Sequence, residues 1–71
     1  MVVKGFNKRG EFKGYLTDYW ESGRYGTSYH LYKITQDRNK AINYSERHEA
    51  ERDIERYKRA HTNFMNFEIT E

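Results

Sequence analysis

The segment from Ser45 to His61 constrains the fold of this chain more than any other. It carries five acidic and five basic residues and very few apolar ones. The apolar side chains recur at spacings of four, three and four residues, which is the period of one face of an α-helix. This stripe consists of Ala50, Ile54, Tyr57 and His61. A helix with so narrow a stripe covers a small sheet with one face and exposes the other to solvent.

The ends of this helix have recognisable signals. Ser45 is the expected N-cap, because its hydroxyl can accept a hydrogen bond from a free backbone N–H for about 1 kcal/mol. Acidic residues fill the early turns and basic residues the later ones, as the helix dipole favours. Asn63 is the expected C-cap. The sequence therefore predicts a helix over residues 45–61.

Five other segments are typical of β-strands. They are residues 2–6, 10–20, 28–35, 40–44 and 64–70. The last of them alternates apolar and polar side chains, as a half-buried strand does. The fold predicted is α+β: a small antiparallel sheet of three to five strands, covered by one helix (about 45–61), with a C-terminal strand (about 64–70). We expect a single domain over residues 1–71.

The connections carry turn residues. Residues 7–10 are typical of a hairpin turn in which Gly10 takes a positive φ. Residues 21–26 contain two glycines and are expected to form a loop, and the polar residues 36–39 a turn. The second strand alternates in places, and this alternation assigns its side chains to two faces. One face carries Phe12, Leu16 and Trp20, and the other carries Lys13, Tyr15, Thr17 and Tyr19.

The composition fits a folded but small core. Of the 71 residues, 35% are hydrophobic and 34% charged, yet 17% are aromatic. A buried aromatic side chain covers about 150–250 Å², so a few suffice for a compact core. The chain has no cysteine, which fits a reducing, cytoplasmic location. It has no apolar run near the roughly 18 residues of a membrane span, so no membrane association is expected.

The order of these elements resembles small proteins encoded by bacteriophages and prophages of Gram-positive bacteria. That group has a Gly-x-Tyr-Leu strand, a later Trp, then an Ala with an aromatic three residues on, and Glu-Ala within a helix. The corresponding residues here are Gly14, Tyr15, Leu16, Trp20, Ala41, Tyr44, Glu49 and Ala50. Gly14 directly precedes Tyr15, which departs from the pattern; Gly10 and Phe12 are the other match. The resemblance covers about residues 10–56 and implies a strand-rich sheet under a helix and a phage origin, but no activity.

Catalytic and metal-binding patterns are incomplete. The run from His48 to Arg52 reads His-Glu-Ala-Glu-Arg, which differs from the zinc motif His-Glu-x-x-His at its last position. A cationic Arg52 at that position would repel zinc. His48 and His61 lie about 20 Å apart along a straight helix, too far to bind the same metal ion. We expect no catalytic residue, no cofactor and no metal site, and therefore no enzyme.

A cluster of aromatic and basic side chains falls on the strands and their loop. It consists of Tyr15, Tyr19, Arg24, Tyr25, His30, Tyr32 and Lys33. If the helix covers one face of the sheet, several of these side chains lie on the open face. Tyr and Arg are enriched where protein partners bind, and the same residues can stack on bases and contact phosphates. The remaining alternative is that the tyrosines complete a thin core with their hydroxyls in water.

The function predicted is that of a non-catalytic binding protein, encoded by a phage or prophage. It would dock on a host or phage protein in the host cytoplasm, through the tyrosine-rich sheet and its loop or through the charged face of the helix. Its role would be to inhibit host defence or a host enzyme. The alternative is a nucleic-acid-binding domain with an aromatic and basic sheet face. Residues 1–40 carry a net charge of +4 and residues 41–71 a net charge of −2, so the first part would hold the nucleic acid. Pairing of an exposed edge strand such as 64–70 would give a homodimer.

Overall fold

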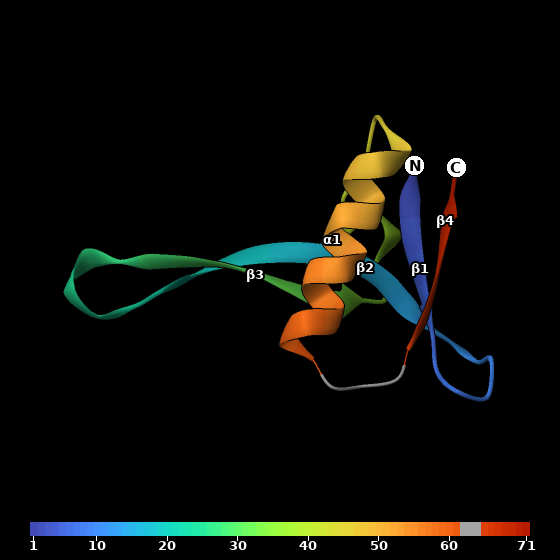
Figure 1. Ribbon diagram of the computed structural model, residues 1–71, viewed down its shortest axis with the longest axis horizontal. Coiled ribbons are helices and arrows are strands. Elements are labelled where there is room, and N and C mark those ends of the chain that lie inside the picture. Colours follow the sequence, from blue (N-terminus) through green and yellow to red (C-terminus); the bar gives the residue numbers. More distant parts are fainter. Residues whose placement is uncertain (62–64) are drawn as a thin grey trace.

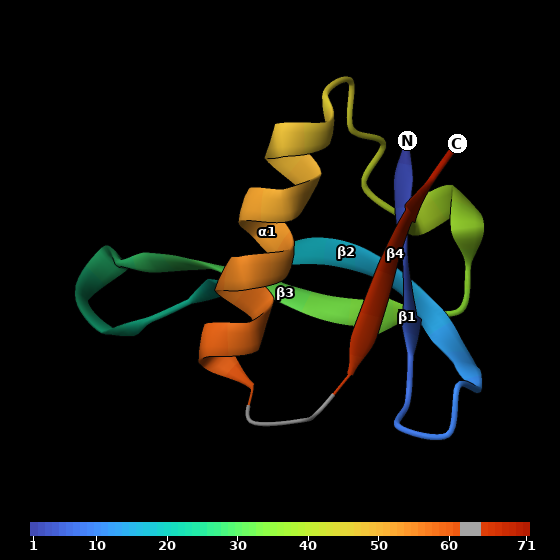
Figure 2. The ribbon, with the colours of Figure 1, turned by 45° about the vertical axis from the view of Figure 1, so that its right-hand side comes forward.

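The computed structural model describes residues 1–61 and 65–71 of the chain. Its elements are β1 (Val2–Phe6), β2 (Phe12–Ser22), the 3₁₀-helix η1 (Arg24–Gly26), β3 (Ser28–Thr35), the 3₁₀-helix η2 (Arg38–Lys40), α1 (Arg47–Ala60) and β4 (Asn66–Thr70). The strands form one antiparallel sheet in the order β3-β2-β1-β4. Helix α1 lies alongside β1 and β4 and crosses the β2–β3 hairpin at its base (Figures 1 and 2). The predicted α+β fold with its C-terminal strand is therefore confirmed.

The core lies between α1 and the sheet and depends on tyrosine. Val3 and Leu16 are fully buried in the middle of the sheet. Tyr32, Tyr44, Ala50 and Tyr57 complete the buried cluster. Half-buried apolar side chains surround it, among them Ile34, Ile54, Phe67 and Ile69. Three of the six buried members are tyrosines, so aromatic side chains supply much of the apolar area that this short chain buries.

The helix begins two residues later than expected. Its first residue is Arg47, its N-cap is Glu46, and no side chain caps it, so the expected Ser45 cap is wrong. The reason lies in the preceding residue. Tyr44 donates its backbone N–H to the Met1 carbonyl at 2.7 Å, which holds it beside β1. Ser45 and Glu46 are then used to bend the chain into the helix. The expected C-cap, Asn63, and the first residue of the predicted last strand lie outside the described residues.

Residues 40–44 do not form the expected strand. They are tied to the sheet by isolated bonds: the Ile42 N–H donates to the Leu16 carbonyl at 3.2 Å, and the Thr17 hydroxyl donates to the Lys40 carbonyl at 2.5 Å. This segment covers Thr17, which is only 6% exposed, on the face of the sheet away from α1. The expectation of an open face opposite the helix is therefore wrong near β1. That face is accessible only farther along β2 and β3.

A bulge near the start of β2 changes which side chains share a face. Gly5 pairs with Gly14 and Phe6 pairs with Phe12, which leaves Lys13 as an extra residue in β2. Phe12 consequently packs at 5.2 Å from the Tyr15 ring, on the face away from Leu16. The expected assignment of Phe12 to the same face as Leu16 is therefore wrong. A bulge reverses the facing of all residues on one side of it.

Gly14 makes the bulge possible, and its replacement by alanine is expected to cost about 2 kcal/mol or more of unfolding free energy. Its φ is +145°, and an added Cβ would stand 2.5 Å from the Thr35 carbonyl oxygen. Urea unfolding monitored by circular dichroism measures the loss. Gly10→Ala is the control, because Gly10 also has a positive φ (+81°) but nothing lies near it. That change should cost only about 1 kcal/mol; equal losses would contradict a close-packed bulge.

Candidate interaction surface

The β2–β3 hairpin extends well beyond the rest of the sheet. The pairing of β1 with β2 ends at Tyr15, whereas β2 and β3 stay paired as far as Ser22 and Ser28. We call residues 18–31 the arm; it projects to the left of α1, β1 and β4 in Figure 1. The molecule measures 41 × 27 × 22 Å. The arm is a two-stranded ribbon without a core of its own, so its side chains face solvent on both sides.

Large aromatic side chains are exposed along the arm. Trp20 is 68% exposed, Tyr25 99% and Tyr29 55%. Tyr19 is also exposed, though less so. Soluble proteins scatter single exposed aromatics over their surface, but a group on one projecting element is typical of an interaction site. The arm is therefore the strongest candidate for a binding surface among the described residues.

Tyr25 is held at the tip in an uncommon backbone conformation. Its φ and ψ are 60° and 35°, in the left-handed region that costs a non-glycine residue roughly 1–2 kcal/mol. The tip is closed by the Gly23 N–H donating to the Thr27 carbonyl at 2.8 Å and by the Thr27 hydroxyl donating to the Arg24 carbonyl at 2.7 Å. These bonds offset the strain, and the tyrosine ring points into open solvent. Strain retained at an exposed aromatic residue is typical of functional positions.

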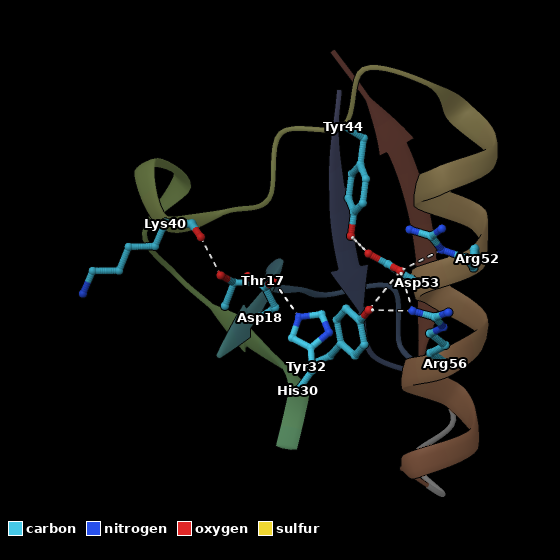
Figure 3. Close-up of polar contacts among 9 residues, drawn as sticks. All are labelled: Thr17, Asp18, His30, Tyr32, Lys40, Tyr44, Arg52, Asp53 and Arg56. Atoms are coloured by element: carbon cyan, nitrogen blue, oxygen red, sulfur yellow. Dashed lines mark hydrogen bonds and ion pairs between the residues drawn. The ribbon is translucent and has the colours of Figure 1, made fainter. Parts of the chain in front are cut away.

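On the side of the arm that faces α1, aromatic rings form a row. Trp20 stacks on His30 with ring centroids 4.9 Å apart, and His30 lies 4.9 Å from the Tyr32 ring. The His30 Nε2 atom is 2.7 Å from an oxygen of Asp18, as Figure 3 shows. This contact fixes the orientation of the imidazole. The row thus links the exposed indole to the buried core.

On the opposite side, cations lie over tyrosine rings. The Lys33 ammonium lies 5.0 Å from the Tyr19 ring centroid, and the Arg38 guanidinium 5.8 Å from that of Tyr15. Arg38 also donates to the backbone carbonyl of Glu71 at 2.9 Å. Tyr15 is therefore partly covered by η2, whereas Tyr19 and Lys33 are accessible.

The structure divides the seven residues expected at a partner site. Tyr19 and Lys33 lie on one side of the hairpin, His30 on the other, and Arg24 and Tyr25 at the tip. Tyr15 lies under Arg38. Tyr32 is buried and donates its hydroxyl to Asp53 at 3.0 Å, so its side chain is mostly withdrawn from the surface on which a partner was expected. In the register, Tyr32 lies opposite Asp18 at the base of the arm, where α1 crosses.

The sequence interpretation missed Trp20 and Tyr29. Trp20 was grouped with the buried Leu16, because the two share a strand face. A signal was present in the lengths of the strands: the run that became β2 is about twice as long as the one that became β1. The residues of β2 that extend past the end of β1 have no neighbouring strand there, so they must project from the sheet. Residues there are exposed on either face.

Asp53 forms a buried polar network that joins three segments (Figure 3). Its carboxylate, in a residue only 5% exposed, accepts hydrogen bonds from the Tyr32 hydroxyl at 3.0 Å and the Tyr44 hydroxyl at 2.8 Å. Arg52 donates to it at 3.4 Å, and Arg56 lies 4.0 Å away. Burial, and then the bond to Asp53, raises the pKa of the Tyr44 hydroxyl. Asp53 is not one of the four residues of the predicted apolar stripe, yet it is buried.

A cleft of about 480 Å³ lies between the base of the arm and the last turns of α1. It is lined by Tyr19, His30, Leu31, Tyr32, Arg56, Ala60 and His61. His61 stacks on Tyr57 at 4.2 Å, which closes one side. A cleft of this size can take one or a few side chains of a partner.

Outside the arm, the described part of the chain has one group of side chains of the metal-ligand type. Glu46, His48 and Glu49 can bring ligand atoms within 4.8 Å of one another at the start of α1. His48 is already 3.0 Å from the Glu46 carboxylate, and both are solvent-exposed. Exposed groups of this kind are common without an ion, so the cluster does not by itself indicate a metal site.

No family model, curated protein or solved structure matches the chain. The class of protein is therefore inferred from the structure alone. None of the described helices has the length and apolar character needed to cross a membrane. The fold and the surface together define the class. It is a small α+β protein with one projecting, aromatic β-hairpin.

Proposed function

We propose that this chain is a non-catalytic binding protein that docks on another protein through its arm. The exposure of Trp20, Tyr25 and Tyr29 on one projecting hairpin supports the proposal most strongly. Trp and Tyr are enriched among the residues that dominate binding energy at protein interfaces. A two-stranded ribbon cannot bury such rings by itself, so the apolar surface of these side chains is buried only when a partner covers it.

The charge of the arm favours a protein partner over nucleic acid. Residues 18–31 contain Asp18, Glu21 and Arg24, so one positive and two negative charges give −1 with His30 neutral. Binding to a phosphate backbone depends on clustered cations, which the arm does not carry. The basic residues of the first 40 positions lie mostly outside the arm. A nucleic acid on the exposed aromatic side chains of the arm would therefore meet few cations, Arg24 at the tip and Lys33 at the base.

The resemblance to phage and prophage proteins extends this proposal to the partner. The partner would be a host or phage protein in the host cytoplasm. Inhibition of a host enzyme or a defence protein is the expected consequence, because a small protein that covers a surface with bulky aromatics blocks access to it.

Replacing Trp20 by alanine is expected to weaken partner binding about tenfold or more, since indole hot spots commonly contribute that much. The test compares proteins captured from lysate of the source cells by the full chain and by the variant, followed by binding measurements on the captured partner. Phe12→Ala is the matched control. Phe12 is 46% exposed but lies at the other end of β2.

Capture that is lost with Trp20→Ala and kept with Phe12→Ala supports docking through the arm. Equal capture by both variants would reject it. A captured nucleic acid that is released as salt rises from about 50 to about 200 mM would instead support the alternative. Circular dichroism of each variant checks that the fold is retained.

A further inference from the structure

β3 is an edge strand whose outer backbone groups can be identified. In an antiparallel pair, residues alternate between those bonded to the partner strand and those pointing away. The Gly23 N–H donates to the Thr27 carbonyl, so these two residues bond across the hairpin. In the next pair, Ser22 with Ser28, the backbone N–H and C=O groups of each residue point away from the other strand. The alternation then places the N–H and C=O groups of His30, Tyr32 and Ile34 on the outer edge. The Leu16 carbonyl, opposite Ile34, does bond outside β3, to Ile42, as this alternation requires.

This edge has few of the features that prevent strand pairing. β3 has eight residues, pairs with β2 without a register shift, contains no proline and carries Lys33 as its one Lys, Arg, Asp or Glu. Natural edges are commonly shortened, bulged or charged to avoid such pairing. No backbone bond from another described segment reaches these outward groups. The edge at β4, by contrast, is five residues long and carries Glu68.

The cleft lies where the side chains of an added strand would point. His30 and Tyr32, which have outward backbone groups, are also among the residues that line the cleft. A strand bonded to them would direct alternate side chains toward α1. There it would meet Arg56, Ala60 and His61. Edge and cleft therefore form one continuous surface.

The charges around the cleft favour an acidic occupant. Among the described residues, Arg56 is the one Lys or Arg that lines it; Lys58 lies over the Phe67 ring and Arg59 pairs with Glu55. No carboxylate lines it. Asp53 faces Arg56 from the core side and Asp18 is bonded to His30, so both acids are already paired. The Arg56 side chain is 52% exposed, and a guanidinium has five N–H donors, so several can meet a further carboxylate.

A second copy of the chain fits this edge less well. Pairing two β3 strands would place two copies of Arg56 at one edge, and no carboxylate of the described residues lines the cleft to receive either. We infer that the partner protein adds an extended, acidic strand to the outer edge of β3 and places a carboxylate in the cleft beside Arg56. This inference rests on the proposed docking function and gives its binding mode, which is β-strand addition.

The experiment uses the full chain and two end-blocked peptides with the eight-residue length of β3. Both alternate valine and threonine; one has a central glutamate and its twin a central lysine. We expect the glutamate peptide to slow hydrogen exchange at the His30 and Tyr32 amides, measured by NMR, and to bind about tenfold more tightly than its twin. Arg56→Gln should remove this preference. Arg59 lies one turn farther along α1, and its side chain is 78% exposed. Arg59→Gln should therefore keep the preference for the glutamate peptide.

Several results would overturn the inference. They are unchanged exchange at His30 and Tyr32, protection at β4 instead, or equal affinity for the two peptides. Protection that grows with protein concentration in the absence of peptide would show that a second copy takes the edge. The proposed function is judged separately by Trp20→Ala. If that change abolishes partner capture while the β3 amides stay unprotected, docking through the arm stands and strand addition fails.

Discussion

Asp53→Ala is expected to lower the free energy of unfolding by about 3–5 kcal/mol, the usual cost of removing one partner from a buried charged network. The change leaves the Tyr32 and Tyr44 hydroxyls, now bonded at 3.0 and 2.8 Å, without their acceptor. A buried donor left unsatisfied loses its full solvation. Since total stabilities of small domains are only about 5–15 kcal/mol, the variant should be mostly unfolded well below the wild-type melting temperature.

The control for this prediction is Glu51→Ala. Glu51 is also on α1, but its side chain is 60% exposed and pairs with Arg47, which is itself exposed. Its loss should change stability by no more than about 0.5 kcal/mol. Asp53→Asn keeps one acceptor oxygen and should lie between the two. Urea unfolding followed by circular dichroism gives all three values. If Asp53→Ala and Glu51→Ala behave alike, the network does not stabilise the fold.

Loss of stability above about pH 10 is the second large effect expected, because a tyrosine ordinarily ionises near that pH. Burial raises the pKa values of Tyr32, Tyr44 and Tyr57 in the folded chain. Above that pH the unfolded state releases protons that the folded state retains. The contribution is therefore fully present below about pH 10 and is lost as the pH rises. Each retained proton adds a slope of about 1.4 kcal/mol per pH unit.

Tyr44→Phe identifies the source of this slope. The change removes one of the three hydroxyls whose pKa is raised by folding. The free energy of unfolding should therefore depend less steeply on pH, by up to one proton per molecule. The variant is less stable at neutral pH, because Asp53 loses a hydrogen bond, but its curve is flatter. Urea midpoints at several alkaline pH values measure the slope, and tyrosinate absorbance shows when the rings ionise. An identical slope in both proteins would mean that Tyr44 ionises equally in both states.

The two predictions concern one feature of the architecture. Asp53 joins α1 to β3 through Tyr32 and to the segment before the helix through Tyr44. The helix has a narrow apolar stripe, so these directional bonds help to determine how it lies on the sheet. They also hold the base of the arm, since Tyr32 is close to His30. A change at Asp53 is therefore expected to affect the arm as well as the core.

Local pattern was enough for the helix and the four strands of the sheet, but it also predicted a strand over residues 40–44 that does not form. The stripe of Ala50, Ile54 and Tyr57 specified a helix, because side chains three and four residues apart share a helix face. Alternation specified the strands, and Gly10 a turn with positive φ. These signals depend on neighbours in the chain, and the sequence carries them whatever the tertiary structure is. Tyr25 and Arg24 were placed in a loop for the same reason.

Burial and strand partners were decided only by the tertiary structure. Trp20 and Leu16 have the same facing in β2, yet one is exposed and the other buried, because α1 reaches only the second. Asp53 looks like a surface acid in the sequence, and only the approach of Tyr32 from β3 and of Tyr44 from the segment before the helix makes it a core residue. Facing is a property of a strand, whereas burial depends on what packs against it. The sequence by itself thus determined the elements, and long-range packing determined which of their side chains remain free to bind.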